Sequence, residues 1–351
     1  MRHRIRLLHL SVALVAALFV VTLGVTGSIM AFEPEIDRWL HHDLWYVDPQ
    51  ARPLTLDEIG SAISQQYPGE RISRFDVSAD PNLAYRVALP SRLVYVNPYT
   101  ARTIGLGGAQ PDTLARIHQI HLRLLWMSHP DAGKAIVTWM CVAMIFLLIT
   151  GLYLWWPLKR FSVTWSASPR RRWLDVHKST GITVFAFLLL AGVTGIAIGF
   201  GTVAESAYYR LTGSTPSPRP PHVVTTSPAG PISPDRVMDL ARAAIPGATP
   251  FQIAIPKPDG TYQVRMRFPE DLTPGGRSRV EIDQYTGAIV FAEGSRTAPA
   301  GTRAVILTRA IHTGDVFGMA SRVAMSLASA LTVVMALSGL LTWWARRRPQ
   351  R

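Results

Sequence analysis

The segment "LLHLSVALVAALFVVTLGVTGSIMAF" (Leu7–Phe32) contains no Lys, Arg, Asp or Glu residue. Three further uncharged runs follow along the chain, at Ala135–Leu158, Ser179–Ala204 and Val323–Ala345. Each run is longer than the roughly 20 apolar residues that a helix needs to cross a bilayer. We therefore predict four transmembrane helices, which account for the hydrophobic fraction of 48% and the mean hydropathy of +0.17.

The first of these runs could instead belong to a signal peptide, because "MRHRIR" (Met1–Arg6) resembles a basic n-region. The apolar run is too long for an h-region, however, and "GSIMAFE" (Gly27–Glu33) is a poor small-x-small cleavage site. We therefore expect an uncleaved first helix.

The distribution of positive charge predicts the orientation of these helices. The segments 1–6, 159–178 and 346–351 are rich in Lys and Arg and contain one acid, Asp175. The positive-inside rule places these segments, and both termini, in the cytoplasm. They supply almost all of the net charge of +13 and explain the pI of 10.4, so we expect no nucleic-acid binding.

The predicted helices and loops divide the chain into seven parts. They are the cytoplasmic tail with helix 1 (1–32), an outer module with an interfacial segment (33–133), helix 2 (134–158), a cytoplasmic loop (159–178), helix 3 (179–204), an outer linker with a second module (205–322), and helix 4 with a tail (323–351). The single cysteine, Cys141, lies within helix 2, so the chain has neither an internal disulfide nor a C-x-x-C-H haem-attachment motif.

The two halves of the chain repeat one pattern. His9 precedes Thr26-Gly27 by the same 17 residues that separate His177 from Thr194-Gly195. The end of the second helix, "TGLYLWW" (Thr150–Trp156), matches the end of the fourth, "SGLLTWW" (Ser338–Trp344). Both halves have the same predicted topology, so the repeat is parallel rather than inverted.

The two outer loops also match. "LTLDEIGSAISQQYPG" (Leu54–Gly69) and "ISPDRVMDLARAAIPG" (Ile232–Gly247) are amphipathic stretches that end in Pro-Gly, where a helix stops. Alternating β-type segments with a Tyr-Thr turn follow in each case, at Tyr99-Thr100 and Tyr285-Thr286. We predict two small α+β modules, the second preceded by the Pro/Ser-rich linker 213–231.

Four of the ten histidines correspond to one another in the repeat. His9 and His177 lie at the cytoplasmic end of outward-running helices, whereas His121 and His312 lie on the outer side ahead of inward-running helices. This places one histidine pair at each membrane face. On a helix His118 would share a face with His121, so it is the alternative outer residue.

Paired imidazoles without neighbouring cysteines favour axial ligation of haem iron, because structural zinc usually takes four side chains that often include Cys. The lack of attachment cysteines makes each haem b-type. We therefore predict two haem b groups, one bound by His9 and His177 and the other by His121 and His312. A proton relay is disfavoured because the middles of the helices lack a chain of Asp, Glu or His.

Several stretches resemble the PepSY-associated transmembrane proteins, a family that includes inner-membrane ferrisiderophore reductases. The matching stretches are Leu7–Asp37, "IHLRLLW" (Ile120–Trp126), "ITGLYLWWPLKR" (Ile149–Arg160), "RRWLDVHKSTG" (Arg171–Gly181), "LTGSTP" (Leu211–Pro216) and "IHTGDVFGMASR" (Ile311–Arg322). The resemblance implies four helices, periplasmic PepSY-like α+β modules and, as in the siderophore reductases, two b-type haems. It aligns the family's Leu-His before helix 2 with His121, whereas "LHLSV" (Leu8–Val12) lacks the Arg and Trp of the usual Leu-His-Arg-Trp motif.

The resulting hypothesis is a bacterial inner-membrane electron carrier, a haem-dependent oxidoreductase of the ferric-siderophore-reductase type. Electrons from a separate cytoplasmic or membrane donor would pass to a periplasmic acceptor, a ferric siderophore in the first instance. The first alternative is a non-enzymatic, membrane-anchored PepSY module that restrains a protease or senses a ligand. The second alternative is a transporter, which would require more polar residues in mid-membrane than these helices contain.

Overall fold

A computed structural model of the chain describes residues 1–107, 113–125, 128–157, 159, 161–222 and 230–346. Leu158 of the predicted second helix, part of the predicted linker (223–229) and the end of the predicted tail (347–351) lie outside the described residues.

The chain forms two units, each made of segments from both halves of the sequence. The helical unit comprises Met1–Glu33, Thr113–Tyr208 and Ala304–Arg351, and the sheet unit comprises Pro34–Asp112 and Tyr209–Arg303. The four histidines of the predicted pairs all belong to the helical unit.

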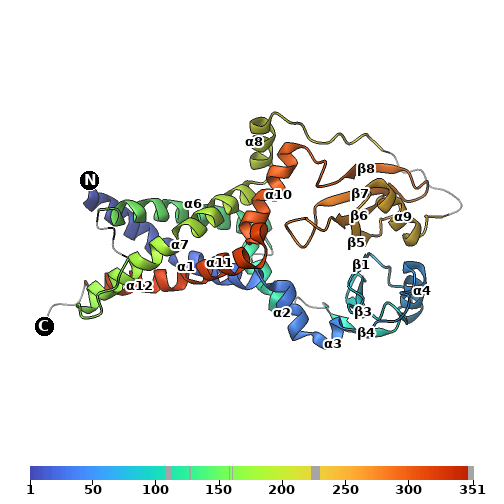
Figure 1. Cartoon of the computed structure of the whole chain (residues 1–351), viewed down its shortest axis with the longest axis horizontal. Coiled ribbons are helices and arrows are strands. Elements are labelled where there is room, and N and C mark those ends of the chain that lie inside the picture. Colours follow the sequence, from blue (N-terminus) through green and yellow to red (C-terminus); the bar gives the residue numbers. More distant parts are fainter. Residues whose placement is uncertain (108–112, 126–127, 158, 160, 223–229, 347–351) are drawn as a thin grey trace. The chain divides into compact units, whose positions relative to one another are not determined.

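Within the described residues, four helical spans are long and apolar enough to cross a membrane. They are α1 (Arg2–Met30), α6 (Pro130–Trp155), α7 (Pro169–Phe200) and the span Met319–Trp344, which consists of α11 (Met319–Ala330) and α12 (Thr332–Trp344). Figure 1 shows these helices running lengthwise beside one another. Helix α1 packs on α6, α6 on α7, α7 on α12, and α12 on α1, which closes a four-membered bundle.

Helix α7 begins earlier than the apolar run predicts. Half of the predicted loop 159–178 is helical, because Pro169 occupies the first turn, where its missing N–H costs no hydrogen bond. His177 therefore lies two turns inside a helix rather than at its start. The other end also differs from the prediction, since α7 stops at Phe200, where Gly201 adopts a φ of +37° before α8 (Thr202–Thr212).

The fourth span is interrupted at Leu331, between α11 and α12. The hydroxyl of Thr332 donates to the Ser329 carbonyl beside this interruption. Gly24 of α1 lies directly against it, since a Cβ on Gly24 would stand 2.5 Å from the Ser329 carbonyl oxygen. Only a residue without a side chain permits this approach.

Short helices precede two of the membrane spans. Helix α5 (Thr113–Arg123) carries His118 and His121 ahead of α6, and α10 (Ala300–Thr313) carries His312 ahead of the 3₁₀ turn η1 (Asp315–Phe317) and α11. The interfacial segment predicted after the first module is therefore helical and packs on α1 and α6.

The described part of the sheet unit contains one eight-stranded antiparallel sheet in the order β4-β3-β2-β1-β5-β6-β7-β8. The first half supplies α4 (Leu56–Gln66), β1 (Arg74–Asp76), β2 (Tyr85–Ala88), β3 (Leu93–Val96) and β4 (Thr103–Gly107). The second half supplies α9 (Pro234–Ala244), β5 (Thr249–Ala254), β6 (Thr261–Arg267), β7 (Ser278–Asp283) and β8 (Ile289–Glu293). The small helices α2 (Glu33–Leu40) and α3 (His42–Trp45) precede α4.

The sequence predicts two modules, and the structure joins their strands into a single sheet. Strand β1 pairs with β5 in antiparallel register, with Phe75 opposite Ile253. A four-stranded sheet alone would leave each of these strands as an unpaired edge, and mutual pairing removes both edges.

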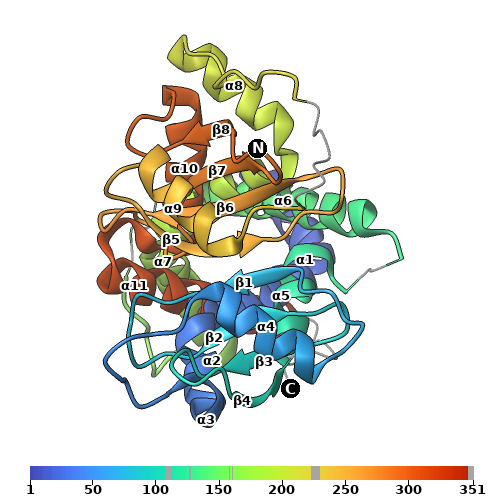
Figure 2. The ribbon, with the colours of Figure 1, turned by 90° about the vertical axis from the view of Figure 1, so that its right-hand side faces the viewer.

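Helices α4 and α9 cover the same face of this sheet, as Figure 2 shows. Alternate strand residues such as Val264, Met266 and Val280 are fully buried beneath them. On the opposite face, Trp45 packs against Leu83 and Tyr95 and covers part of the first half.

Candidate functional site

The structure brings the four repeat-related histidines together in two pairs. His9 on α1 and His177 on α7 have ring centroids 6.4 Å apart, with the ring planes at 85°. His121 on α5 and His312 on α10 have ring centroids 6.3 Å apart, with the planes at 58°. Each pair thus combines one histidine from each half of the chain.

These separations match the spacing of two imidazoles on opposite sides of one metal ion. A ring nitrogen lies about 2 Å from the metal, and bonds of about 1.33 Å place each ring atom roughly 1.1 Å from the ring centroid. Two such imidazoles would have centroids about 6.2 Å apart. Both pairs lie within a few tenths of an ångström of this value.

A hydroxyl on a neighbouring helix meets the Nδ1 atom of three of these histidines. His9 Nδ1 lies 2.8 Å from Thr150 Oγ1 of α6, and His121 Nδ1 lies 3.0 Å from Thr26 Oγ1 of α1. His312 Nδ1 lies 3.0 Å from Thr194 Oγ1 of α7. In the first half, α1 and the α5–α6 segment each contribute one histidine and one threonine to these hydrogen bonds.

The fourth histidine has a similar environment with a different acceptor. His177 Nδ1 donates to the Met335 carbonyl at 2.9 Å, and Ser338 Oγ stands farther away, at 3.5 Å. Both acceptors belong to α12, so the second half repeats the arrangement of the first.

These contacts define the tautomer of the imidazoles. Each threonine hydroxyl already donates to a carbonyl of its own helix, as Thr150 does to Phe146 at 2.7 Å and Thr26 to Thr22 at 2.6 Å. The hydroxyl oxygen then accepts from the histidine, which must carry its proton on Nδ1. The Nε2 lone pair remains available, as a metal ligand requires.

A glycine follows each of these hydroxyl residues and lies against the Cε1 edge of the same histidine. A Cβ on Gly27 would stand 3.0 Å from His121 Cε1, whereas the corresponding distances at Gly151, Gly195 and Gly339 are 3.4–3.5 Å. We call these four Thr-Gly or Ser-Gly pairs the histidine cradles. They comprise Thr26-Gly27, Thr150-Gly151, Thr194-Gly195 and Ser338-Gly339.

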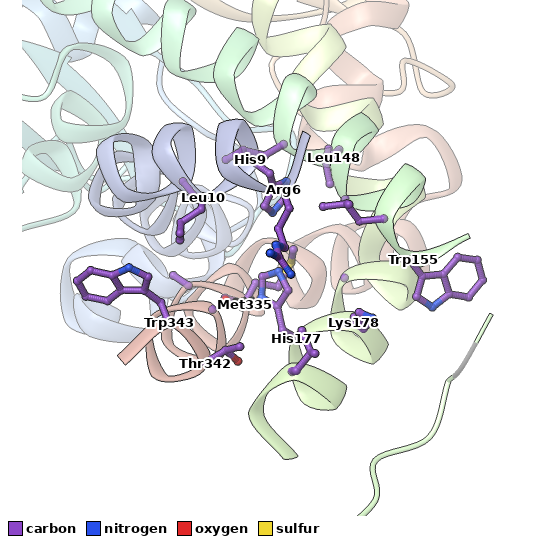
Figure 3. A pocket seen from close by; sticks show the side chains of 18 of the residues that line it. Arg6, His9, Leu10, Leu148, Trp155, His177, Lys178, Met335, Thr342 and Trp343 are labelled. Carbon is purple, nitrogen blue, oxygen red and sulfur yellow. Dashed lines mark hydrogen bonds between the residues drawn. The ribbon is translucent and has the colours of Figure 1, made fainter. Parts of the chain in front are cut away.

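The His9–His177 pair lines a cavity of about 670 Å³ between the helices, within the range of about 300–1,000 Å³ typical of cofactor sites. In Figure 3 the two histidines lie between Trp343 on one side and Trp155 on the other. Leucine side chains line much of the wall. Basic residues also contribute to the lining, namely Arg2, Arg6, Arg170, Lys178 and Arg346. An apolar slot with a cationic margin fits a macrocycle that carries acidic propionates.

His121 and His312 lie outside the four membrane-spanning helices, and both are neutral at pH 7. Burial lowers the pKa of each imidazole to about 4. The proximity of His312 contributes to the lowered pKa of His121, and the proximity of Arg309 contributes to that of His312. A metal-binding imidazole must be neutral, so both rings are in the state that ligation needs.

His118, the alternative to His121, points to a different partner. Its Nδ1 lies 2.9 Å from Glu33 Oε2, with which it forms an ion pair when protonated. His121, rather than His118, faces His312 across the 6.3 Å separation.

In the part of the chain that the structure describes, no group of three or more His, Cys, Asp or Glu side chains could hold a metal ion. Each pair therefore offers two imidazoles, fewer than the three or four protein ligands of a zinc site. A pair of imidazoles without further ligands is a donor set that would suit a haem iron.

The comparison with protein families covers this whole arrangement. A sequence model of the PepSY-associated TM region matches residues 6–346, nearly the entire chain. The chain belongs to the PepSY-associated TM family. The match includes both histidine pairs, all four cradles and the sheet unit of this family member. The comparison with curated proteins finds no match.

In the sequence of this PepSY-associated TM protein, the cradle residues indicate that the two halves repeat, but they do not indicate that these residues contact the histidines. The 17-residue spacing from His9 to Thr26, and from His177 to Thr194, reflects helix geometry within α1 and α7. The spacing gives no indication that Thr26 contacts His121, because that contact joins different helices.

Proposed function

We propose that this protein is a dihaem b-type electron carrier of the bacterial inner membrane. One haem would bind between His9 and His177, and the other between His121 and His312. The observation that carries the proposal is the separation of the ring centroids, 6.4 and 6.3 Å, in two pairs related by the repeat. Two repeat-related pairs at this distance, each with matching cradles, are not expected by chance.

When bound, each haem supplies reversible one-electron chemistry between Fe(III) and Fe(II). The chain's own residues bind and orient it. The four histidines offer Nε2, and the leucines around the His9–His177 cavity exclude water. Three cradle threonines keep the proton of their histidines on Nδ1, and the Met335 carbonyl does the same for His177. Arg2, Arg6 and Arg170 line the same cavity and would pair with propionates.

The direction of electron flow follows from the proposed orientation. Lys and Arg cluster in the segments next to the His9–His177 end, so we place this end and both termini in the cytoplasm. A separate cytoplasmic or membrane donor would reduce the haem there. The His121–His312 end would then pass the electron to a periplasmic acceptor.

The proposed acceptor is a ferric siderophore. One electron converts its Fe(III) to Fe(II), and no bond in the organic ligand needs to break. The lower ionic charge weakens the attraction of anionic oxygen ligands for the metal, so the iron is released. The chain needs no nucleophile or acid–base pair for this step, only a reduced centre within reach of the acceptor.

Optical spectroscopy of the purified full chain tests this proposal. We expect a Soret band, a haem-to-protein ratio of two and loss of one haem in His177→Ala. Reduced protein should be reoxidised by a ferric siderophore and release Fe(II), which a ferrous chelator detects. A protein isolated from haem-replete cells without a Soret band would refute the haem sites.

A second candidate function is a non-enzymatic binding module that restrains a protease or senses a ligand. The observation in its favour is the large sheet unit, which contains no member of either histidine pair. This function predicts that variants without the four histidines keep full biological activity. The electron-transfer proposal predicts that they lose it.

A further inference from the structure

The sheet unit has a second face, opposite α4 and α9, where charged and polar side chains form a continuous row. Six residues on six neighbouring strands, β2, β1, β5, β6, β7 and β8, are paired directly across the sheet. The row consists of Arg86, Asp76, Gln252, Arg265, Arg279 and Glu293. Because strand side chains alternate between faces, all six lie on the face away from the helices.

At one end of the row, two arginines share one buried carboxylate. Asp76 is buried and forms ion pairs with Arg74 at 2.9 Å and with Arg86 at 3.3 Å. The Gln252 side chain donates to the same carboxylate at 2.7 Å. Arg86 also stacks over Trp45, 4.6 Å from the ring centroid. Both guanidinium groups at this end are therefore already held by the Asp76 carboxylate.

The other end of the row is covered by the segment 217–222. Ser217 donates to Glu293 at 2.6 Å, and Arg219 donates to Glu281 at 2.6 Å. His222 lies 2.6 Å from the buried carboxylate of Asp283. The carboxylates of Glu281, Asp283 and Glu293 on β7 and β8 are therefore already hydrogen-bonded to this segment.

Positive charge remains unbalanced in the middle of the row. Arg265 stands directly opposite Arg279, and Arg267 follows two residues along β6 on the same face. All three side chains are exposed. Arg279 lies 3.9 Å from Glu293, and its guanidinium stands 4.9 Å from the Phe291 ring centroid. Arg267 donates to the Pro274 carbonyl at 3.4 Å, and among the described residues neither Arg265 nor Arg267 forms an ion pair with a carboxylate.

This arrangement costs free energy unless an anion joins it, because like charges directly opposite on neighbouring strands are destabilising. Guanidinium groups bind carboxylates through two parallel hydrogen bonds, and one carboxylate can bridge two adjacent guanidiniums. Arg267 lies about 7 Å from Arg265 along the strand, which is within reach of a second carboxylate on the same small molecule.

We propose that Arg265, Arg267 and Arg279 form a binding site for a small molecule that carries two or more carboxylates. Gln252 and Gln263 flank the arginines on the same face and can hydrogen-bond to its hydroxyl or amide groups. The site is bounded by Asp76 on one side and by Glu281 and Glu293 on the other. These carboxylates repel a long acidic peptide laid across the strands and therefore favour a compact ligand.

Calorimetric titration of the full chain in neutral detergent with citrate, at low ionic strength, tests the site. We expect citrate to bind, and both Arg265→Gln and Arg279→Gln to weaken its affinity at least tenfold. Arg242→Gln should leave the affinity unchanged, since this exposed arginine lies on α9 and pairs with Asp239. Added salt should weaken citrate binding in the wild type.

Three other ligands distinguish this site from its alternatives. Acetate should bind much more weakly than citrate, because it can satisfy only one arginine pair. Tighter binding of inorganic phosphate or of a glutamate-rich peptide than of citrate would overturn the proposal. So would equal citrate affinities of the wild type and Arg265→Gln.

Thermal unfolding without ligand supplies an independent readout. Removing one charge from the Arg265–Arg279 pair relieves repulsion, so Arg265→Gln should unfold at the wild-type temperature or slightly above it. A clear loss of stability would show that the pair supports the fold, which contradicts a ligand-binding role. The outcome is separable from the haem proposal, because no proposed haem ligand belongs to the sheet unit.

Discussion

The ring of His121 faces the ring of His312 at a centroid distance of 6.3 Å, although the two residues come from different halves of the chain. The Nδ1 atom of each ring is hydrogen-bonded to a threonine hydroxyl, His121 to Thr26 of α1 and His312 to Thr194 of α7. The two supports are independent of each other. Removing one histidine therefore leaves the other in position, and the loss should be confined to a single site.

We predict that His312→Ala and His177→Ala each reduce the haem content from two per chain to one. A haem iron that loses one of its two protein ligands is held far less strongly, while the distant pair keeps both of its ligands. The pyridine haemochromogen assay, with protein determined by amino-acid analysis, measures the ratio. Loss of both haems in either variant would contradict independent sites.

His118→Ala provides the matched control for the outer pair. His118 pairs with Glu33 and not with His312, so this variant should keep two haems, whereas His121→Ala should keep one. The reverse result would assign the ligand to His118.

The cradle hydroxyls should tune the redox potential. The bond from His9 Nδ1–H to Thr150 raises the basicity of the imidazole, which favours Fe(III). Thr150→Val removes the acceptor, so the midpoint potential of one haem should rise and its affinity fall by about 10–100-fold. Spectroelectrochemical titration measures the potential. Thr150→Ser, which restores the hydroxyl, should return the potential toward the wild-type value.

Thr183→Val is the control for hydroxyl loss in an apolar helix. Thr183 lies on α7 and donates only to the Ser179 carbonyl. Its removal should leave both potentials unchanged. If Thr150→Val and Thr183→Val changed the midpoint potential equally, the change would come from a general disturbance of the helix bundle and not from the lost hydrogen bond to His9.

The sequence predicts the membrane-spanning helices well because their length and lack of charge are local properties. It fails at the start of α7, where charged residues from Arg170 onward hide a helix that simply extends beyond the apolar run. It also does not predict the pairing of β1 with β5, because strand pairing between distant segments leaves no local pattern.

For the candidate site, the sequence predicts the two histidine pairs but not which of two neighbouring histidines belongs to the outer pair. The repeat predicts that His9 pairs with His177 and that His312 pairs with a histidine of the segment before α6, since equivalent positions meet around a common axis. The sequence cannot rank His121 above His118 from spacing alone, because both lie on one face of α5. Which of the two faces His312 depends on how α5 packs on α1, where Gly27 leaves room for the His121 ring.

The glycines of the cradles should differ in their tolerance of a methyl group. A Cβ on Gly27 would press against His121 Cε1 at 3.0 Å, whereas a Cβ on Gly151 would meet His9 Cε1 at an ordinary 3.5 Å. Gly27→Ala should therefore lower haem content at the His121–His312 pair, and Gly151→Ala should retain both haems. Alanine also favours a helix over glycine by about 1 kcal/mol, so neither variant is expected to unfold.

Haem content and thermal unfolding together test this difference. If Gly151→Ala lost more haem than Gly27→Ala, contact with the imidazole would not be the reason for the glycine. A large fall in the unfolding temperature of Gly27→Ala would indicate disrupted helix packing instead of a displaced ring.

Acid should destabilise the sheet unit through Asp283. Burial alone would raise the pKa of this carboxyl, but the backbone N–H of Thr286, the His222 side chain and the N–H of Tyr285 outweigh it and hold the pKa at about 2. An unfolded Asp has a pKa of about 3.9. The carboxylate therefore stabilises the fold above about pH 4, and this stabilisation is lost as the pH falls toward 2.

Calorimetric unfolding of the full chain between pH 6 and pH 2 measures this effect. We predict that Asp283→Asn lowers the unfolding temperature of the sheet unit by a few degrees at pH 6, and that the difference from wild type disappears near pH 2. Asp259→Asn, at an exposed turn residue, should follow the wild-type curve throughout. A difference between wild type and Asp283→Asn that stays constant down to pH 2 would mean that the stabilisation does not come from the charge of the carboxylate.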